Sequence, residues 1–228
     1  MRQVSTNWEI LAENFSFAGR SVVDVGCGTG ELVRWLTGQG ANVTGLDTPQ
    51  MLEKGESSPR AGGEKYMTGG AEKLPLEDEC ADLIIYFASL HHAPPERLAD
   101  ALSECRRVLK PGGHAVFIEP VAQPGSYYEI VRLVEDEAEI QKLAHAAIRD
   151  GTRLGMRAVK EELFFIERSF EDYVRLLNTF VDDENKRETA LRQARIATER
   201  LAAESGQRFG DYRFRSTCRL HILEKGDR

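Results

Sequence analysis

Three closely spaced glycines are the residues of this sequence that point most directly to ligand binding. They are Gly26, Gly28 and Gly30. They lie between a β-rich run at residues 21–25 and a helical pattern at residues 31–37. Glycines at such a turn let the backbone approach a ligand, and the free N–H groups at the helix start favour an anionic group. A dinucleotide fingerprint GxGxxG would require glycine where this chain has Glu31, so the pattern is instead DxGxGxG, beginning at Asp24.

A carboxylate follows the next predicted strand. Asp47 comes directly after the run at residues 42–46, 19 positions beyond Gly28. A carboxylate at that place can accept hydrogen bonds from both hydroxyls of a ribose. Asp47 alone does not distinguish one nucleoside ligand from another. Without the glycine turn, a loop or helix-capping role before Pro49 would be equally favoured.

The first half of the chain alternates strand and helix patterns. Strand patterns fall at residues 21–25, 42–46, 65–67, 81–87 and 114–119, and helix patterns at residues 31–37 and 95–109. The run at residues 81–87 is nearly all apolar, as is typical of a central parallel strand covered on both faces. This alternation predicts a mostly parallel sheet with helices on both sides.

The pattern changes after Pro120. Residues 121–160, with a helix expected at residues 129–149, are interpreted as an insertion that forms a lid or acceptor-binding segment. An amphipathic helix is expected within the N-terminal residues 1–18. Its apolar face contains Trp8, Leu11, Ala12 and Phe15. Further patterns predict a strand at 162–169, helices at 170–180 and 183–204, and a last strand at 212–223.

Composition narrows the class of protein. A chain of 228 residues fits one domain, residues 1–228, and lacks the apolar run of about 18 residues that a membrane span needs. Its four cysteines form no CxxC pair, so we expect reduced thiols in a cytoplasmic protein and no metal site. The net charge of −7 disfavours bulk nucleic acid as a partner, because Lys and Arg supply most of the affinity for phosphates.

Four segments, in order and at ordinary spacing, resemble successive motifs of the class I S-adenosylmethionine-dependent methyltransferases. More narrowly, they resemble the group that includes the ubiquinone and menaquinone biosynthesis methyltransferases, which carry the methyltransferase type 11 domain. The segments are DVGCGTG (24–30), GLDTPQML (45–52), GGAEKLPLEDECADLIIYFASLHH (69–92) and LSECRRVLKPGGHAVFIEP (102–120). Four linked motifs are more specific than any single one.

The resemblance implies a Rossmann-like α/β fold with a seven-stranded, mostly parallel sheet of order 3-2-1-4-5-7-6, in which strand 7 is antiparallel. The cofactor S-adenosylmethionine would then lie across the carboxyl ends of strands 1 and 2. By motif position, Gly26, Cys27 and Gly28 would give backbone contacts to its methionine part within the turn that Gly30 closes. Asp24 would help to hold the amino group.

The remaining cofactor contacts follow from the later motifs. The resemblance implies that Asp47 holds the ribose, and that Thr48 and Met51 lie against the adenine. Ala71 and Glu72 correspond to the turn that faces the adenine edge.

One position departs from the family. An Asp usually precedes the Ala-Glu pair and accepts a hydrogen bond from the adenine amine, but this chain has Gly70 there. The loss of one such charge-assisted hydrogen bond would weaken cofactor binding by about 1.5 to 3 kcal/mol unless another group replaces it. Phe87 and Ala88 correspond to the floor below the sulfonium.

Two histidines are the candidate catalytic residues. An oxygen or nitrogen acceptor can require a base, and His91 and His92, just beyond the strand at residues 81–87, are the best placed by sequence. The alternative is that one of them packs or hydrogen-bonds to order the loop. Glu119, at the end of the strand at residues 114–119, also points toward the acceptor side.

Other polar and aromatic residues leave their roles open. Tyr127 and Tyr128 fit ordinary packing of a lid helix and an aromatic acceptor pocket equally well. His145 and His221 fit structural or solvated positions better than a ligand role.

The sequence therefore predicts methyl transfer from S-adenosylmethionine to a small-molecule acceptor by in-line displacement at the sulfonium methyl. A magnesium site of the catechol type would need acidic residues after the fourth strand, where Ser89, His91 and His92 stand. The alternative function is a catalytically silent S-adenosylmethionine-binding module with a regulatory or interaction role. A monomer or a homodimer is expected.

Overall fold

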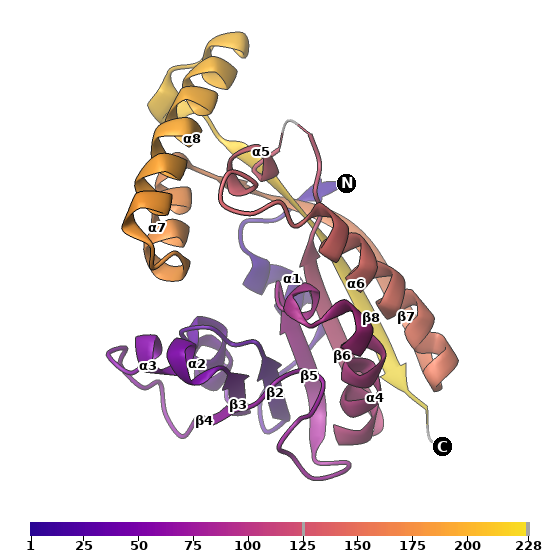
Figure 1. The fold of residues 1–228 in the computed structure, drawn as a ribbon. Helices are drawn as coiled ribbons and strands as arrows, with labels where there is room; N and C mark the ends of the chain where they lie inside the picture. Colours follow the sequence, from indigo (N-terminus) through magenta and orange to yellow (C-terminus); the bar gives the residue numbers. More distant parts are fainter. Residues whose placement is uncertain (125, 227–228) are drawn as a thin grey trace. The chain divides into compact units, whose positions relative to one another are not determined.

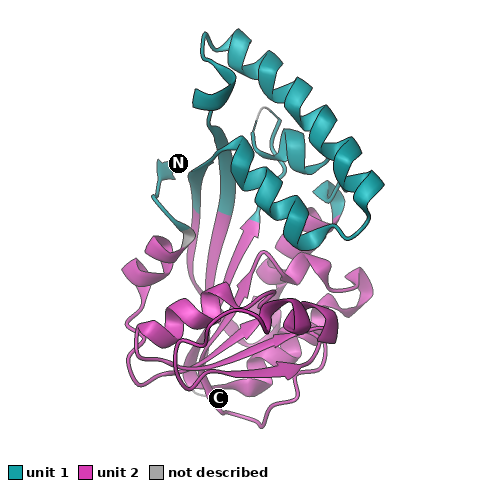
Figure 2. Ribbon diagram, turned by 90° about the vertical axis from the view of Figure 1, so that its left-hand side faces the viewer, with its two compact units in different colours: residues 1–7, 120–139, 163–218 teal, residues 8–119, 140–162, 219–228 magenta. Residues whose placement is uncertain are grey.

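The computed structural model describes residues 1–124 and 126–226 (Figure 1). Chain contacts divide it into two compact units, coloured separately in Figure 2. Unit 1 comprises residues 1–7, 120–139 and 163–218. Unit 2 comprises residues 8–119, 140–162 and 219–228. Among the described residues, no helix combines the length and the hydrophobicity needed to cross a membrane.

The described residues form an eight-stranded sheet of order β1-β7-β8-β6-β5-β2-β3-β4. The strands are β1 (Arg2–Gln3), β2 (Ser21–Val25), β3 (Asn42–Asp47), β4 (Lys65–Thr68), β5 (Ala81–Phe87), β6 (Leu109–Pro120), β7 (Met156–Arg168) and β8 (Phe214–Lys225). The fold class is confirmed. The count differs from the expected seven because β1, only two residues long, is added beside β7.

Strand directions also follow the expectation. Strands β2, β3, β4, β5 and β6 pair in parallel. Strand β8 runs against β6, because Lys225 Nζ at its end donates to the Leu109 carbonyl at the start of β6, 2.7 Å away. The Val121 N–H, just after β6, correspondingly donates to the Thr217 carbonyl near the start of β8, at 3.0 Å. Figure 1 shows the arrow of β8 opposed to that of β6.

The helices include the predicted ones, with some shifted bounds. They are α1 (Asn7–Asn14), α2 (Glu31–Gly38), α3 (Pro49–Gly55), α4 (Leu98–Val108), α5 (Tyr128–Val131), α6 (Ala138–Asp150), α7 (Phe170–Phe180) and α8 (Glu184–Glu204). Short 3-10 turns are η1 (Leu90–His92), η2 (Pro95–Arg97), η3 (Gly151–Leu154) and η4 (Phe209–Asp211). The helix expected at residues 129–149 is divided into α5 and α6.

The strand β6 begins earlier than predicted. The helix α4 ends at Val108, and β6 starts at Leu109 rather than at His114. The register of β6 against β5 shifts between Ala81 and Leu83, so the Pro-Gly-Gly sequence lies within an irregular part of the strand. A local turn pattern does not show that β5 pairs with β6 both before and after the Pro-Gly-Gly sequence.

The core of unit 2 forms around β5. Leu83, Ile84, Ile85 and Tyr86 are fully buried, which confirms the strand covered on both faces. Tyr86 stacks on Phe117 of β6, with ring centroids 5.0 Å apart. The buried stripe of α4 joins this core through Leu98, Ala101, Leu102, Cys105 and Val108.

The N-terminal helix α1 is shorter than the segment in which it was expected. Leu11 is buried, as predicted, but its buried neighbour is Ile10, whereas Ala12 is exposed. Trp8 stacks on Trp35 of α2 at 5.9 Å between ring centroids. The apolar face was therefore only partly predicted, because three-dimensional packing selected Ile10.

Unit 1 has a small core of its own among α5, α7, α8 and the start of β8. Tyr127 contacts Tyr173 of α7 and Phe214 of β8 edge to face, at 6.4 and 5.9 Å between ring centroids. Tyr127 is 7% exposed and Tyr173 fully buried, so packing is the role that the contacts support for Tyr127. The segment 121–160 is divided between the units at residues 139 and 140.

A capping box starts α7 and allows a stability test. The Ser169 hydroxyl accepts from the Asp172 N–H, and the Asp172 carboxylate accepts from the Ser169 N–H. Ser169→Ala should lower the free energy of unfolding by about 1 kcal/mol, because the helix start loses a hydrogen-bond acceptor. Chemical denaturation measures it, and Asn178→Ala, at an exposed position of the same helix, should show no such loss. Equal stability of the two variants would contradict the capping role.

Candidate functional site

The glycine turn follows β2 and is attached to β3. The N–H groups of Gly26 and Cys27 both donate to the Leu46 carbonyl, at 2.8 and 3.0 Å. Gly26 and Gly30 have φ values of 75° and 81°, which side-chain-bearing residues rarely adopt. A Cβ on Gly26 would lie 2.4 Å from the Ser89 Cβ. The turn therefore needs glycine for its backbone and, at Gly26, also for space.

Asp47 links the turn to the start of α3. Its carboxylate accepts from the Gly28 N–H at 2.7 Å and from the Thr48 N–H at 2.7 Å. The Thr48 side chain in turn caps α3 by accepting from the Met51 N–H at 3.4 Å. Each carboxylate oxygen has a second lone pair, so Asp47 can still accept hydrogen bonds from a diol.

Asp24 is the most unusual ionisable group of this region. It lies within β2, is 1% exposed, and neither of its carboxylate oxygens has a hydrogen-bond partner among the described residues. Burial, and then the negative charge of Asp47, raise its pKa from 3.8 to about 8. A buried, unpartnered carboxylate is costly to a fold, so its presence indicates a cationic or hydrogen-bond-donating ligand.

The Cys27 thiol lies in an environment that keeps it protonated. The side chain is 8% exposed, and burial with the nearby carboxylates of Asp24 and Asp47 raises the pKa of the thiol. A thiol that remains protonated is a poor nucleophile. The predicted backbone contact of Cys27 with a cofactor stays a prediction.

The loop after β4 lies beside Asp47. The Gly69 N–H donates to the Asp47 carbonyl at 3.2 Å, and the Lys73 N–H closes a turn onto the Gly70 carbonyl at 3.2 Å. A Cβ built on Gly70 would lie 2.8 and 2.9 Å from the two carboxylate oxygens of Glu72. The acidic group therefore occupies the space that a side chain of Gly70 would need. Ala71, between them, is half-buried.

The segment after β5 contains the predicted histidines and a partner that the sequence did not assign to them. Glu119, 3% exposed, accepts from the Leu90 N–H at 2.9 Å and from the Ser89 N–H at 3.3 Å. Its other oxygen is hydrogen-bonded to Nδ1 of His91, which is also 3% exposed. His92 is exposed, and the centroid of its ring lies 4.1 Å from the centroid of the His91 ring.

This arrangement sets the protonation pattern of His91. A carboxylate only accepts, so in the neutral ring Nδ1 carries the proton and Nε2 the lone pair. From its position at a strand end, the sequence predicts Glu119 on the acceptor side. Its hydrogen bond with His91 joins residues that are 28 positions apart, so no local sequence pattern predicts this pair.

The residues expected below the sulfonium are on the same segment. The ring of Phe87 lies 5.4 Å from that of Trp8. Ala88 has a φ of 49°, and its N–H donates to the Ile118 carbonyl at 2.8 Å. A positive φ at a residue with a Cβ is strained backbone, which concentrates at functional sites.

His145 and His221 lie elsewhere in unit 2, in a hydrogen-bonded group with two charged residues. His145 Nδ1 is 3.0 Å from His221 Nε2, and Arg219 Nη1 lies 3.0 Å from His145 Nε2 and 2.6 Å from a Glu161 oxygen. Burial lowers the pKa of His221 to about 4. An arginine already provides the cation of this group, which supports the structural role expected from the sequence.

Comparisons with known proteins show which family model and which relatives the chain is similar to. Residues 23–117 match the family model described as methyltransferase domain. This part of the chain is similar to a methyltransferase domain. The matched segment spans the glycine turn, Asp47, the loop after β4 and the paired histidines, so the resemblance stated from the motifs is confirmed.

Two relatives illustrate how far the similarity extends. The malonyl-[acyl-carrier protein] O-methyltransferase of Pectobacterium atrosepticum is 35% identical over 116 residues, which cover 50% of this chain and 44% of that protein. The ubiquinone biosynthesis O-methyltransferase of Pseudomonas putida strain F1 is 33% identical over 128 residues, 53% of this chain and 52% of that protein. The chain thus spans about half the length of these relatives.

Solved structures share the fold over nearly the whole chain. The YcgJ protein of Bacillus subtilis is similar with a TM-score of 0.64 at 17% sequence identity. The match covers 96% of this chain and 97% of that protein. A SAM-dependent methyltransferase of Methanosarcina mazei has a TM-score of 0.58 at 14% identity, with 98% of this chain and 99% of that one covered. At such identities the likeness is one of fold.

The close approach at Gly26 can be tested with a matched glycine. Gly26→Ala should be clearly more destabilising than Gly19→Ala, because both glycines have positive φ but nothing lies within 4 Å of a Cβ at Gly19. We expect about 1 kcal/mol from backbone strain in both, and a further cost of about 1 to 3 kcal/mol at Gly26 from overpacking. Urea denaturation measures the difference. Similar losses in the two variants would exclude the steric constraint.

The raised pKa of Asp24 predicts a pH-dependent stability difference. A carboxyl whose pKa is raised on folding binds more protons in the folded state, so its stabilising contribution is complete below about pH 4 and is lost as the pH rises through about 8. Asp24→Asn, which cannot ionise, should therefore gain stability relative to the original protein as the pH rises from 4 to 8. Unfolding free energies in urea over this range measure it. A difference that does not change with pH would contradict the assignment.

Proposed function

We propose that this protein transfers a methyl group from S-adenosylmethionine to a small-molecule acceptor. The observation that carries the proposal is Asp24, a fully buried carboxylate with two unpartnered oxygens next to a glycine turn. The α-ammonium group of S-adenosylmethionine supplies the positive charge and N–H donors that such a carboxylate lacks. It would satisfy both the charge and the hydrogen-bonding capacity of Asp24.

The surrounding residues fit the rest of the cofactor. The backbone of Gly26, Cys27, Gly28 and Gly30 gives the methionine part close access. Asp47, fixed by two backbone N–H groups, presents its remaining lone pairs to the ribose hydroxyls.

The adenine would lie beside the start of α3 and the loop after β4. Thr48 and Met51 contact it from α3, and Gly70, Ala71 and Glu72 face its edge. Both segments adjoin Asp47, since Thr48 follows it and Gly69 donates to its carbonyl.

The chemistry needs few protein groups. When bound, S-adenosylmethionine supplies a methyl group on a sulfonium that is already activated toward in-line displacement by a nucleophile. The protein positions the acceptor and excludes water. Phe87 and Ala88 form the floor of the site, and their segment continues directly into the histidines.

His91 acts as the general base for an acceptor that must lose a proton, and Glu119 holds its tautomer. Because Nδ1 donates to the carboxylate, Nε2 is the nitrogen that can take the proton, and the developing imidazolium is stabilised by Glu119. The His92 ring lies against that of His91 in a tilted arrangement, and in this proposal it orders the segment. A base of this kind fits methylation on oxygen, the class of reaction named for both relatives described above.

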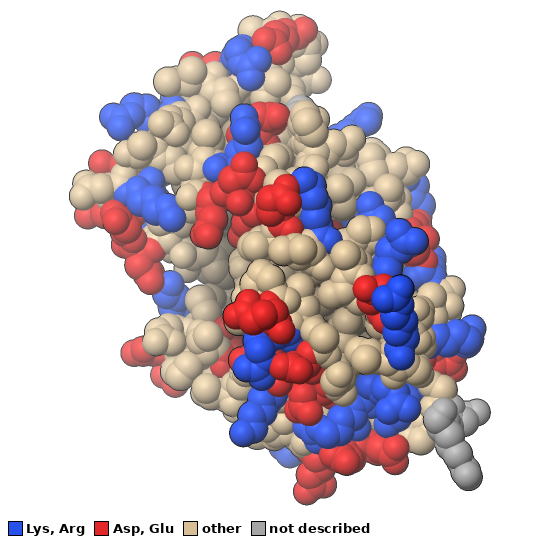
Figure 3. All heavy atoms as spheres, turned by 45° about the vertical axis from the view of Figure 1, so that its right-hand side comes forward, with Lys and Arg blue, Asp and Glu red and all other residues tan. Residues whose placement is uncertain are grey.

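Charge and cysteine chemistry support a cytoplasmic protein with a small-molecule substrate. The net charge is −7, and on the face drawn in Figure 3 the Lys and Arg side chains are interspersed with Asp and Glu. Such a distribution does not favour bulk nucleic acid. All four cysteines are free thiols.

Calorimetry followed by an activity screen tests the proposal. The purified protein should bind S-adenosylmethionine and S-adenosylhomocysteine, and should form the latter when supplied with an oxygen acceptor such as a phenol or a carboxylic acid. The absence of binding at millimolar concentration would refute the function. Tight binding without turnover on any acceptor would instead favour a silent binding module.

Asp47→Ala should weaken the binding of S-adenosylhomocysteine by about 1 to 3 kcal/mol, because the ribose loses its acceptor and the turn loses a fixed partner. Isothermal titration measures the change. Glu53→Ala, an exposed carboxylate on α3, is the control and should retain the affinity. Unchanged affinity in Asp47→Ala would show that the ribose assignment is wrong.

Glu119→Gln should reduce kcat by a factor of about 10 to 100 while S-adenosylhomocysteine affinity is retained, because an amide orients His91 but cannot stabilise its protonated form. The pH profile separates the roles. If Glu119 supports a base, the acidic limb of the pH profile of kcat should move to lower pH in the variant, because the protonated form of the base is less stabilised. A parallel loss of cofactor binding would indicate a structural role only.

A further inference from the structure

We propose that Glu72 selects the adenine base of the cofactor by accepting a hydrogen bond from its exocyclic amine, with Gly70 providing the space for this carboxylate. The inference rests on the proposed function and specifies how one part of that site recognises its ligand. It names Glu72 as the acceptor for the adenine amine, because Gly70 has no side chain that could accept this hydrogen bond.

The first observation is the position of the Glu72 carboxylate. Its two oxygens lie 2.8 and 2.9 Å from the point where a Cβ of residue 70 would be, and its Cδ lies 3.0 Å from that point. No Cβ can approach atoms so closely. The side chain of Glu72 is thus folded back over Gly70 and fills the volume that any larger residue there would occupy.

The second observation concerns the backbone of Gly70. Its φ does not lie in the left-handed region, so the conformation does not itself require glycine. The neighbouring carboxylate, which ends a flexible side chain, would instead have to shift from its position if residue 70 had a Cβ. An acidic residue at position 70 would also place two negative charges side by side, and the like charges would repel each other.

The third observation is the relation of this loop to the proposed ribose site. Gly69 donates to the Asp47 carbonyl, and the Lys73 N–H closes the turn onto the Gly70 carbonyl. A nucleoside whose ribose is bound by Asp47 therefore has its base next to this turn. The Glu72 carboxylate accepts no hydrogen bond from any residue within the described parts of the chain, so its lone pairs remain available to a donor.

A carboxylate gives a defined selectivity. Adenine presents an N–H donor at its exocyclic position, whereas hypoxanthine presents a carbonyl oxygen there. A carboxylate only accepts, so it binds the first and repels the second. A buried or half-buried acceptor that meets another acceptor loses its hydrogen bond altogether, which is a large source of discrimination.

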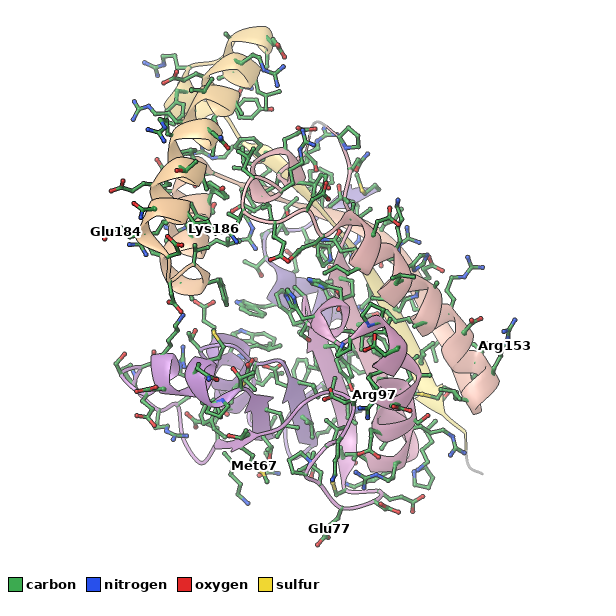
Figure 4. The ribbon with its side chains drawn as sticks, viewed as in Figure 1. Met67, Glu77, Arg97, Arg153, Glu184 and Lys186 are labelled. Carbon is green, nitrogen blue, oxygen red and sulfur yellow. The ribbon has the colours of Figure 1, made fainter. Side chains whose placement is uncertain are left out.

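A competing role for Glu72 is pairing with Arg97. Arg97, labelled in Figure 4, lies at the start of α4, and its charge interacts with Glu72. Its ion pair, however, is with Asp100, at 2.5 Å. If Glu72 served Arg97 alone, removing Arg97 would have the same effect on ligand binding as removing Glu72.

Isothermal titration with two ligands tests the proposal. S-adenosylhomocysteine is compared with S-inosylhomocysteine, which differs in the exocyclic group and the adjacent ring nitrogen. The original protein should prefer the adenine ligand by at least about ten-fold, the factor expected for one charge-assisted hydrogen bond. Glu72→Ala should lose most of this preference, with the loss confined to the adenine ligand.

A relocated carboxylate provides the converse test. Gly70→Asp with Glu72→Ala should restore the preference for adenine, because the new side chain occupies the vacated space. Gly70→Asp alone should weaken binding of both ligands, because the two carboxylates compete for one volume. Thermal melts without ligand establish that each variant is folded.

Two controls separate base recognition from charge. Glu77→Ala removes the same charge from an exposed position of the same connection, labelled in Figure 4, and should leave the preference unchanged. Arg97→Ala should do likewise. An unaltered preference in folded Glu72→Ala, or its loss in Arg97→Ala, would overturn the inference while leaving S-adenosylhomocysteine binding, and with it the proposed function, intact. No binding of either ligand by the original protein would refute both.

Discussion

The site depends on a backbone constraint, the attachment of the glycine turn to the end of β3. Four N–H groups converge there, since Gly26 and Cys27 donate to the Leu46 carbonyl and Gly28 and Thr48 to the Asp47 carboxylate. A turn with positive φ values would otherwise be mobile, because glycine has the largest conformational freedom of any residue. The carboxylate removes that freedom before any ligand binds, and preorganisation of this kind reduces the entropic cost of binding.

The same constraint brings two carboxylates close together. Asp47 is held by backbone donors, whereas Asp24 has no partner and is buried, so its pKa rises and it remains protonated over much of the neutral range. A single cation at this place would relieve both the burial and the repulsion. The strain that the fold accepts at Asp24, and at the positive φ of Ala88, lies at the carboxyl ends of adjacent strands, where ligands bind in open α/β sheets.

The loop after β4 shows how a departure from a family pattern can be compensated. Considered as sequence, Gly70 removes an acceptor and predicts weaker binding. In the structure, a carboxylate two residues further along occupies the vacated volume. The structure differs from the sequence-based expectation because a glutamate side chain is long enough to fold back across a tight turn. A motif that compares residues position by position does not include such a contact.

The sequence by itself determined the parallel core and the positions of the glycine turn and Asp47, because these depend on hydrophobic periodicity and on local turn chemistry. The sheet order was implied by the resemblance to a known family. The helices α7 and α8 were likewise predictable from caps and amphipathic patterns. Only the tertiary structure decided the pairing of His91 with Glu119, the isolation of Asp24, the fold-back of Glu72 and the early start of β6. Each of these depends on contacts between residues whose proximity arises from packing and strand register, and such contacts leave no periodic trace along the chain.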